Sequence, residues 1–265
     1  MAVFEKIRDK FRLSAFHWGR GINLKPIENA YDNLEFQSFI ADKTKAFASS
    51  PIENYQKNID SSKLGVLGFL NTPEIVEVIE IGGGAGIDFF IANRYVGFSK
   101  KWTIYETEAM CKVVSKHGAT NPMLNFRSDI SSLNSKSFFG SMAVYCNSSL
   151  QYFTDPLDML RQLLEMKPRK IGILRTPFCD ESPNFSYLQE SAINDNGPQV
   201  HSNSKHSGVV QVQVNLVSVG EVRTLFAELG YTIVYEESRE SNFVKTTAPR
   251  RLDVRNYLML AEKLT

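Results

Sequence analysis

A glycine-rich turn is the first feature of this sequence whose residue types and spacing could do chemistry. Gly82, Gly84 and Gly86 follow a short β-rich run that contains Glu80. Glycines let the main chain approach a bound group closely and adopt conformations that a Cβ forbids. A helix that begins after such a turn presents free N–H groups and the positive end of its dipole. The turn therefore predicts a site for a nucleoside-type ligand that carries a carboxylate or a phosphate.

Polar side chains lie at the ends of three further β-rich runs. Glu106 ends the second run, Asp129 follows the third, and Asn147 follows the fourth. A carboxylate at Glu106 can accept hydrogen bonds from both hydroxyls of a ribose. Glu108 lies nearby as an alternative partner, and a solvated acid at a strand end is the other interpretation of Glu106. Asp129 is equally well explained as a turn or N-cap residue.

The elements that must position these side chains alternate between strand and helix. Helices are expected at 87–95, 109–117, 156–166 and 218–229, and strands at 77–81, 101–106, 124–127, 141–146, 170–175, 231–235 and 257–261. Ser218 and Glu221 have the spacing of a capping box at the start of the last helix. This alternation predicts an α/β fold, with a mainly parallel sheet covered on both faces. Ligands of such sheets bind beyond the carboxyl ends of the strands.

The length of 265 residues suggests one large domain with an appendage. Residues 1–62 are predicted to form a helical N-terminal extension that acts as a lid, and residues 63–265 to form the core domain. A polar stretch at about 178–215 is expected to be a substrate loop, because loops of this kind lie above the site and carry function. Residues 3–13 have the pattern of a packed helix, with an amphipathic helix on a membrane surface as the alternative.

Composition excludes several classes of function. The formal net charge of +1 provides no overall field for nucleic acid. Cys111, Cys146 and Cys179 are spaced for neither a zinc site nor a disulfide framework, so a reducing cytoplasm is the simplest compartment. No stretch is long and apolar enough to span a bilayer, and the N-terminus lacks the apolar core of a signal peptide. We expect a cytoplasmic protein with no integral membrane segment and no bound metal.

The spacing of the glycines separates two classes of cofactor. A dinucleotide fold has GxGxxG, whereas this turn is GxGxG and Ile87 stands at the third-glycine position. The segment 80–86 resembles the first motif of the class I S-adenosylmethionine-dependent methyltransferases. The resemblance covers about residues 76–155 in order, and the final strand pair fits the antiparallel edge of that family. It implies a seven-stranded, doubly wound Rossmann-like sheet with an antiparallel terminal strand, and S-adenosylmethionine as the cofactor.

The resemblance also implies roles for single residues. It places the ribose-binding acid at Glu106, an acid facing the adenine amino group at Asp129, and a backbone or amide contact to the cofactor at Asn147. The first motif supplies the other predicted cofactor-binding residues, Glu80, Gly82, Gly84 and Gly86. The turn after the fourth strand supplies candidates for lining the cofactor or the substrate mouth, Ser149, Gln151 and Tyr152.

Methyl transfer to a hydroxyl usually needs a general base. His201 and His206 lie in the polar stretch after the fifth strand, and we predict one of them as that base, with surface loop histidines as the alternative. Nucleic-acid methylation is disfavoured because no Asn-Pro-Pro-Tyr or Asp-Pro-Pro-Tyr segment follows the fourth strand. The expected substrate is therefore a small molecule, with the hydroxyl of a sugar or nucleotide-sugar as acceptor.

A finer similarity links the N-terminal extension and the turn at 150–153 to methyltransferases encoded with bacterial surface-polysaccharide genes. Two alternatives stay open beside methyl transfer. One is an NAD(P)-dependent oxidoreductase, against which the glycine spacing argues. The other is a non-catalytic module that keeps the methyltransferase fold. The oligomeric state is left open.

Overall fold

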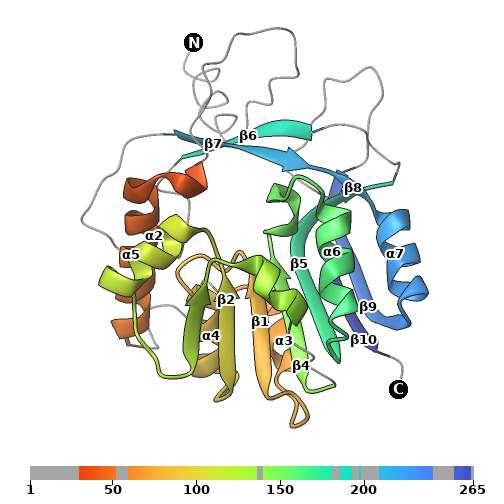
Figure 1. The fold of residues 1–265 in the computed structure, drawn as a ribbon, viewed down its shortest axis with the longest axis horizontal. Helices are drawn as coiled ribbons and strands as arrows, with labels where there is room; N and C mark the ends of the chain where they lie inside the picture. The colour runs from red at the N-terminus through yellow and green to blue at the C-terminus, as the bar shows by residue number, and fades with distance from the viewer. Residues whose placement is uncertain are drawn as a thin grey trace, which may run out of the picture.

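The computed structural model describes residues 30–51, 59–135, 140–180, 186–192, 197, 209–240 and 254–263. Its main sheet has eight strands, seven of which follow the order β3-β2-β1-β4-β5-β10-β9 (Figure 1). Five of these seven strands are parallel to one another: β1 (Glu77–Ile81), β2 (Lys101–Tyr105), β3 (Leu124–Arg127), β4 (Met142–Asn147) and β5 (Lys170–Cys179). β10 (Val254–Lys263) is antiparallel to both β5 and β9 (Tyr231–Glu240). The predicted mainly parallel α/β sheet with an antiparallel terminal strand is confirmed.

Helices cover both faces of this sheet because its central strands are apolar on both sides. Ile79 and Val144 pack in the same core as α6 (Pro156–Glu165) and α7 (Val219–Glu228). Val78 and Ala143 point the other way, into the core formed with α3 (Ser61–Leu70) and α4 (Ile87–Tyr95). Successive side chains of a strand alternate between faces, so a run of buried residues such as β1 and β4 requires a helical layer on each.

The N-terminal part of the described chain is helical. A short 3-10 helix, η1 (Ala30–Asp32), precedes α2 (Leu34–Ser49), whose N-cap Asn33 accepts a hydrogen bond from the N–H of Phe36. α2 packs on α5 (Glu108–His117) through a small core that contains Ala41 and Met110. The helix expected at residues 3–13 lies outside the described residues, and the domain boundary after residue 62 stays a prediction.

The stretch expected to be a substrate loop contains two strands. β6 (Ser186–Ala192) and β7 (Val209–Asn215) pair in an antiparallel sheet of their own, which lies across the carboxyl ends of the main strands (Figure 1). β7 contacts both η1 and η5 (Leu150–Tyr152), and Asn215 donates a hydrogen bond to the carbonyl of Phe153 at 2.7 Å. The alternation of valine with polar residues in β7 explains the strand, because one of its faces is buried at Val214.

Smaller differences from the expected elements lie at their ends. β5, β9 and β10 extend beyond the expected runs, and a two-residue strand, β8 (Val217–Ser218), pairs with the end of β5.

Over the described ranges, no helix is long and apolar enough to cross a membrane. Within those same ranges, no group of three His, Cys, Asp or Glu side chains is placed to hold a metal ion.

Candidate functional site

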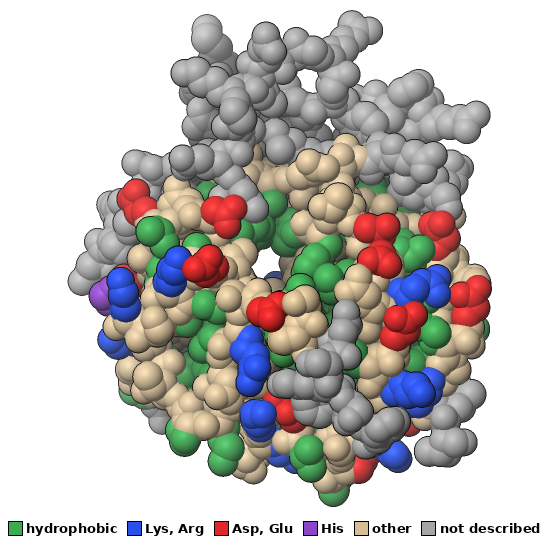
Figure 2. Space-filling model, viewed as in Figure 1, with side chains coloured by type: hydrophobic (Ala, Val, Ile, Leu, Met, Phe, Trp, Pro, Cys, Tyr) green, Lys and Arg blue, Asp and Glu red, His purple; other side chains and the backbone are tan. Residues whose placement is uncertain are grey.

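The candidate site lies where the strand order of the sheet reverses. β1 has β2 on one side and β4 on the other, so chain segments leaving β1 and β4 diverge and leave a crevice at their carboxyl ends. Figure 2 shows the molecule hollowed there, between the side that carries α5 and the side that carries α6. The predicted cofactor residues lie at the carboxyl ends of β1 and β4 and in the turns after β1, β2 and β3, which all reach this edge of the sheet.

The glycine turn after β1 has a backbone that only glycine adopts readily. Gly82, Gly84 and Gly86 have φ angles of 66°, 58° and 88°, all in the left-handed region. At Gly82 there is also no room for a side chain, because a Cβ would lie 2.6 Å from the Cβ of Ser149. The turn after β1 and the turn after β4 are therefore in close contact at this position. Gly86 is the N-cap residue of α4, and it has no side chain that could accept a hydrogen bond from the first N–H groups of this helix.

Glu106 joins the end of β2 to the glycine turn. Its Oε1 accepts a hydrogen bond from the N–H of Gly84, and its Oε2 accepts one from the N–H of Thr107, each at 2.8 Å. Burial raises the pKa of the Glu106 carboxyl, and the two backbone hydrogen bonds offset part of that effect. Each carboxylate oxygen can still accept a further hydrogen bond. Glu108 is exposed and pairs with Lys112 on α5 at 2.7 Å, so Glu106 is the acid that faces the turn.

Glu80 supports the turn from beneath. It is 1% exposed, and its Oε2 accepts a hydrogen bond from the indole of Trp102 at 2.8 Å. Its carboxyl carbon would lie 2.4 Å from a Cβ on Gly83, so the carboxyl group fills the space under that residue. Burial, together with the nearby carboxylate of Asp88, raises the pKa of Glu80 well above its usual range. Its predicted contact with a cofactor stays a prediction.

Two buried polar atoms at the site have no hydrogen-bond partner among the described residues. They are the Oγ of Ser149, which is 4% exposed, and the Oε1 of Gln151, which is 3% exposed. Leaving such atoms unpaired costs free energy, so they mark places where a bound group could supply the missing bond. The Oγ of Ser149 would be 3.5 Å from a Cβ on Gly82, which places it at the glycine turn. These residues therefore fit a polar ligand lying over that turn.

Asn147 belongs to a hydrogen-bonded network at the end of β4. Its amide nitrogen donates to the carboxylate of Asp88, which also accepts from the hydroxyl of Tyr145 at 2.9 Å and pairs with Lys63. Its amide oxygen accepts from the Nε of Arg175 at 2.9 Å. Burial opposes the charge on Asp88, but Lys63 and the hydrogen bond from Asn147 outweigh it and lower the pKa of Asp88. The side-chain amide of Asn147 is thus engaged by Asp88 and Arg175, and its predicted contact with a cofactor stays a prediction.

The remaining predicted site residues are Asp129, His201 and His206. Asp129 is exposed at the start of η4 (Ile130–Ser135), and its Oδ1 accepts hydrogen bonds from the N–H and the hydroxyl of Ser131. It has the turn role that the sequence also allowed, and its contact with an adenine stays a prediction. His201 and His206 lie outside the described residues.

Tyr31 is a candidate that the sequence analysis missed. Its ring lies 5.2 Å from the ring of Tyr152, so η1 and η5 meet at the carboxyl edge of the sheet. Its carbonyl accepts a hydrogen bond from the hydroxyl of Thr107, the residue after Glu106. Burial, with Tyr152 and Glu106 nearby, raises the pKa of the Tyr31 phenol well above its usual range. No local pattern distinguishes this tyrosine, because its partners lie far away in sequence.

Comparison with protein-family models finds no match, and comparison with curated proteins finds none either. Among solved structures, the N-terminal domain of EvdMO1, in the presence of SAH and D-fucose, is 15% identical over 100% of this chain and 98% of its own, with a TM-score of 0.45. Magnesium protoporphyrin IX methyltransferase from Synechocystis PCC 6803, with bound SAH, is 11% identical over 89% and 97%, with a TM-score of 0.49. The cyclase SpnF is 11% identical over 90% and 97%, with a TM-score of 0.48. The function is therefore inferred from the residues of this chain.

Proposed function

We propose that this protein is an S-adenosylmethionine-dependent methyltransferase acting on a small molecule. The observation that carries this proposal is the junction of the glycine turn with Glu106, whose carboxylate accepts from the N–H of Gly84 and keeps free acceptor positions. The hydroxyl of Ser149, which has no hydrogen-bond partner among the described residues, comes from the turn after β4 and lies at the same glycine turn. An acid that accepts two hydroxyls, a backbone open to close approach and an unsatisfied hydroxyl suit a nucleoside with a polar tail.

The proposed cofactor would supply an electrophilic methyl group on a positively charged sulfur. The task of the chain is then to bind the cofactor and the acceptor, to align them, and to exclude water from the crevice. Glu106 would accept hydrogen bonds from the ribose hydroxyls, and Ser149 would complete its hydrogen bonding with the ligand. Tyr31 in η1 and Tyr152 in η5, whose rings lie 5.2 Å apart, would border the ligand. Alignment of two reactants in this way is worth about 7–11 kcal/mol of the barrier.

The dinucleotide alternative is disfavoured by the start of α4. A dinucleotide fold needs a third glycine there so that helix and strand pack closely. Ile87 stands at that position, partly buried and packed against the core shared by α3 and α4. Close packing of the helix start falls one residue earlier, at Gly86, where a Cβ would lie 3.0 Å from Leu124, so the glycine spacing differs from that of a dinucleotide-binding turn.

For the acceptor we propose the hydroxyl of a sugar or nucleotide-sugar, with His201 or His206 as general base. Residues 178–215 are proposed to form the substrate segment, and residues 1–62 the lid. A cytoplasmic role in surface-polysaccharide synthesis is the finer proposal, and it rests only on the similarity of the N-terminal extension and of the turn at 150–153. The non-catalytic module remains the competing proposal.

Titration calorimetry with S-adenosylmethionine, S-adenosylhomocysteine and NADPH tests the cofactor. We expect the two adenosyl compounds to bind the wild type. The substitution Glu106→Gln removes the charge of the ribose acceptor and should weaken binding by about 1.5–3 kcal/mol, which is tenfold or more. Glu108→Gln is the matched control, because that acid is exposed and paired with Lys112. Binding of NADPH alone, or equal affinities in both variants, would contradict the proposal.

Turnover distinguishes an enzyme from a non-catalytic module. The wild type is incubated with S-adenosylmethionine and a set of sugars and nucleotide-sugars, and S-adenosylhomocysteine is measured by mass spectrometry. Acceptor-dependent formation of S-adenosylhomocysteine, lost in His201→Ala or His206→Ala, is the expected result. Tight cofactor binding without turnover for any hydroxyl acceptor would favour the module.

A further inference from the structure

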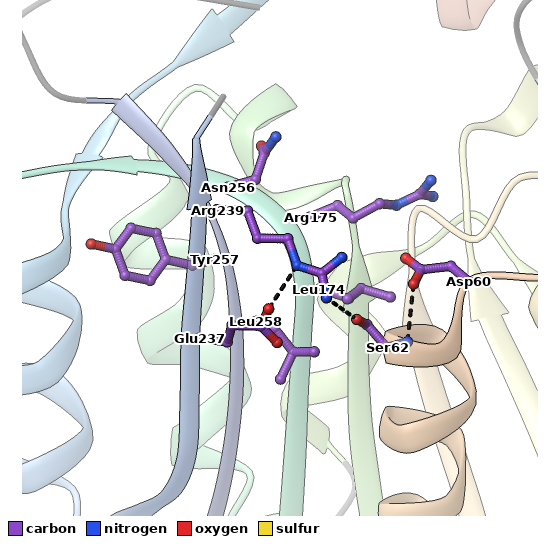
Figure 3. A pocket seen from close by; sticks show the side chains of 9 residues that line it. All are labelled: Asp60, Ser62, Leu174, Arg175, Glu237, Arg239, Asn256, Tyr257 and Leu258. Carbon is purple, nitrogen blue, oxygen red and sulfur yellow. Dashed lines mark hydrogen bonds and ion pairs between the residues drawn. The ribbon is translucent and has the colours of Figure 1, made fainter. Parts of the chain in front are cut away.

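A second hollow lies beside the candidate cofactor site, on the face of the sheet covered by α3. It is open to solvent and is lined by the start of α3, by β5 and by the antiparallel strands β9 and β10 (Figure 3). Two arginines line it, Arg175 from β5 and Arg239 from β9. Figure 3 shows Arg175 reaching past the start of α3, on the side away from Tyr257. The hollow therefore lies next to the cofactor crevice, at the carboxyl ends of the paired strands β4 and β5.

The two arginines differ in how they are satisfied. Arg239 pairs with the carboxylate of Glu237 at 2.7 Å and donates to the hydroxyl of Ser62 at 2.8 Å. Arg175 is exposed, and within the described part of the chain only its Nε has a hydrogen-bond partner, the amide oxygen of Asn147. Its two terminal amino groups have no hydrogen-bond partner among these residues. A guanidinium with these groups available is the side chain best suited to hold a phosphate or a carboxylate through two parallel hydrogen bonds.

The backbone at Arg175 is strained. Its φ is 52°, in the left-handed region that residues with a Cβ disfavour. Ser148, at the end of the adjoining strand, has a φ of 54°, and its N–H donates to the carbonyl of Leu174 at 2.8 Å. In the described ranges three non-glycine residues have positive φ, and these two lie side by side. Strained backbone persists only where the surrounding structure forces it, and such residues cluster at ligand sites and active sites.

The strained arginine is also held from behind. The amide of Asn147 bridges Arg175 and the buried carboxylate of Asp88, and Lys63 pairs with that carboxylate in turn. The chain Lys63–Asp88–Asn147–Arg175 therefore fixes the guanidinium at its Nε and leaves its outer edge toward solvent. Asp88 and Asn147 act as positioning residues, because neither needs to touch the ligand.

We propose that Arg175 binds an oxyanion of the methyl acceptor, a phosphate or a carboxylate, and so anchors the acceptor beside the cofactor crevice. This inference rests on the proposed methyltransferase function. Asn147 ends β4 and Ser149 lies two residues later, so an anion on Arg175 is held next to the turn that faces the glycine residues. When its anionic group is bound to Arg175, the acceptor has a fixed orientation, and its reacting hydroxyl can be aligned with the methyl group of the cofactor.

The test uses the full chain, with and without S-adenosylhomocysteine, titrated with pyrophosphate, glucuronate and glucose. We expect pyrophosphate or glucuronate to bind the wild type and glucose to bind at least about tenfold more weakly. Arg175→Gln should weaken anion binding by at least about tenfold, and Arg175→Lys should recover part of it. Arg161→Gln is the matched control, because Arg161 lies on α6, where its guanidinium is 3.9 Å from Glu228. Preference for pyrophosphate identifies a phosphate anchor, and preference for glucuronate a carboxylate anchor.

A second variant removes a repulsive charge instead of the attractive one. Asp60 is exposed at the rim of the hollow and caps α3 by accepting from the N–H of Ser62. Asparagine caps a helix equally well, so Asp60→Asn keeps the fold and deletes one negative charge. Anion affinity should rise by about two- to fivefold at low salt. A wild type that binds none of the anions, or unchanged anion affinity in Arg175→Gln of unaltered thermal stability, would overturn the inference.

Failure of the underlying function is distinguishable from failure of this inference. S-Adenosylhomocysteine binding that is intact in the wild type, with no anion binding dependent on Arg175, overturns the anchor and leaves the methyltransferase proposal standing. Anion binding that depends on Arg175, without binding of any adenosyl compound, overturns the acceptor role and leaves an oxyanion site.

Discussion

Two neighbouring parts of the carboxyl edge of the sheet hold their polar groups in different ways. The first, which we call the glycine half, consists of the turn 82–86 and Glu106, and its hydrogen bonds run from backbone N–H groups to one carboxylate. The second, the arginine half, consists of Asn147, Asp88 and Arg175, and its hydrogen bonds run between side chains.

The difference follows from where each half gets its rigidity. In the glycine half, left-handed glycines shape the backbone at little cost, and one acid fixes the result. In the arginine half, residues with side chains take left-handed conformations at Ser148 and Arg175, and a buried ion pair stands behind them. A backbone cradle suits a ligand that is approached closely on all sides, whereas a supported guanidinium suits a single charged group. The following predictions test this division.

The largest expected effect is at the base of the arginine half. Asp88→Ala leaves Lys63, whose side chain is 11% exposed, without its carboxylate, and removes the acceptor of Tyr145 and Asn147. We expect the free energy of unfolding to fall by about 3–5 kcal/mol, measured by urea denaturation. Asp88→Ala combined with Lys63→Met should lose less than the sum of the two single variants. Additive losses would mean that the two side chains act independently.

Asp88→Asn addresses the positioning role, because it keeps an amide oxygen toward Asn147. Under conditions where this variant is folded, pyrophosphate affinity should fall more than S-adenosylhomocysteine affinity. Equal losses for both ligands would show that the two halves are one unit.

The next largest effect is in the glycine half. Gly82→Ala adds a Cβ at a φ of 66°, and this Cβ would lie 2.6 Å from the Cβ of Ser149. We expect the free energy of unfolding to fall by roughly 2–4 kcal/mol and nucleoside binding to weaken as well. Gly97→Ala is the control, because its φ is 68° but a Cβ there would meet nothing within 4 Å. The control should lose only about 1–2 kcal/mol. Equal losses would remove close contact with Ser149 as the reason for glycine at position 82.

The glycine half could be predicted from the sequence because its determinants are local. A buried strand, a glycine turn and an acid at the next strand end lie within thirty residues of one another, between Glu77 and Glu106. The seven main strands were predictable for the same reason, since hydrophobic runs and turn residues mark each one. Glu80 belongs to the predicted motif, but no spacing rule reveals its place beneath Gly83 or its hydrogen bond from Trp102.

The arginine half was not predictable, because its members meet only after folding. Lys63 and Asp88 are 25 residues apart, Asp88 and Asn147 are 59 apart, and Asn147 and Arg175 are 28 apart. Asn147 carried a local signal, as a polar residue at a strand end, whereas Arg175 lies inside a strand and its left-handed backbone is invisible in the sequence. The strands β6 and β7 were missed for another reason: the alternating valines of β7 lie within a stretch that is polar on average.

A smaller effect is the pH dependence of nucleoside binding. Burial raises the pKa of Glu106 above its usual 4.5, and hydrogen bonds from a ribose would favour the charged form and lower it on binding. Affinity is therefore full above the pKa of Glu106 in the free protein and falls as pH decreases through it, by at most about tenfold per pH unit. Calorimetry with S-adenosylhomocysteine between about pH 5 and 7.5 measures this slope.

Two variants make the pH experiment specific. Glu106→Gln should give weaker binding without this slope, and Glu108→Gln should keep the wild-type slope, since Glu108 is exposed and paired with Lys112. The same raised pKa means that the folded chain binds a proton at Glu106 more tightly than the unfolded chain does. Stability should therefore decrease as pH rises from 4.5 to the folded pKa, and Glu106→Gln should remove that contribution. A slope that persists in Glu106→Gln would assign the titration to another group.

The smallest expected effect concerns strain at Arg175 itself. Glycine tolerates a φ of 52° and alanine does not, so Arg175→Gly should be more stable than Arg175→Ala by about 1 kcal/mol, measured by urea denaturation. Lys167, at the end of α6, has a φ of 57° and serves as the control, where Lys167→Gly should exceed Lys167→Ala by a similar amount. Both variants at position 175 should lose pyrophosphate binding, and both at position 167 should keep it. If strain is relieved equally at the two positions but binding is lost at only one, the loss comes from the missing guanidinium, and arginine stands at position 175 for its ligand although glycine would fold there at lower cost.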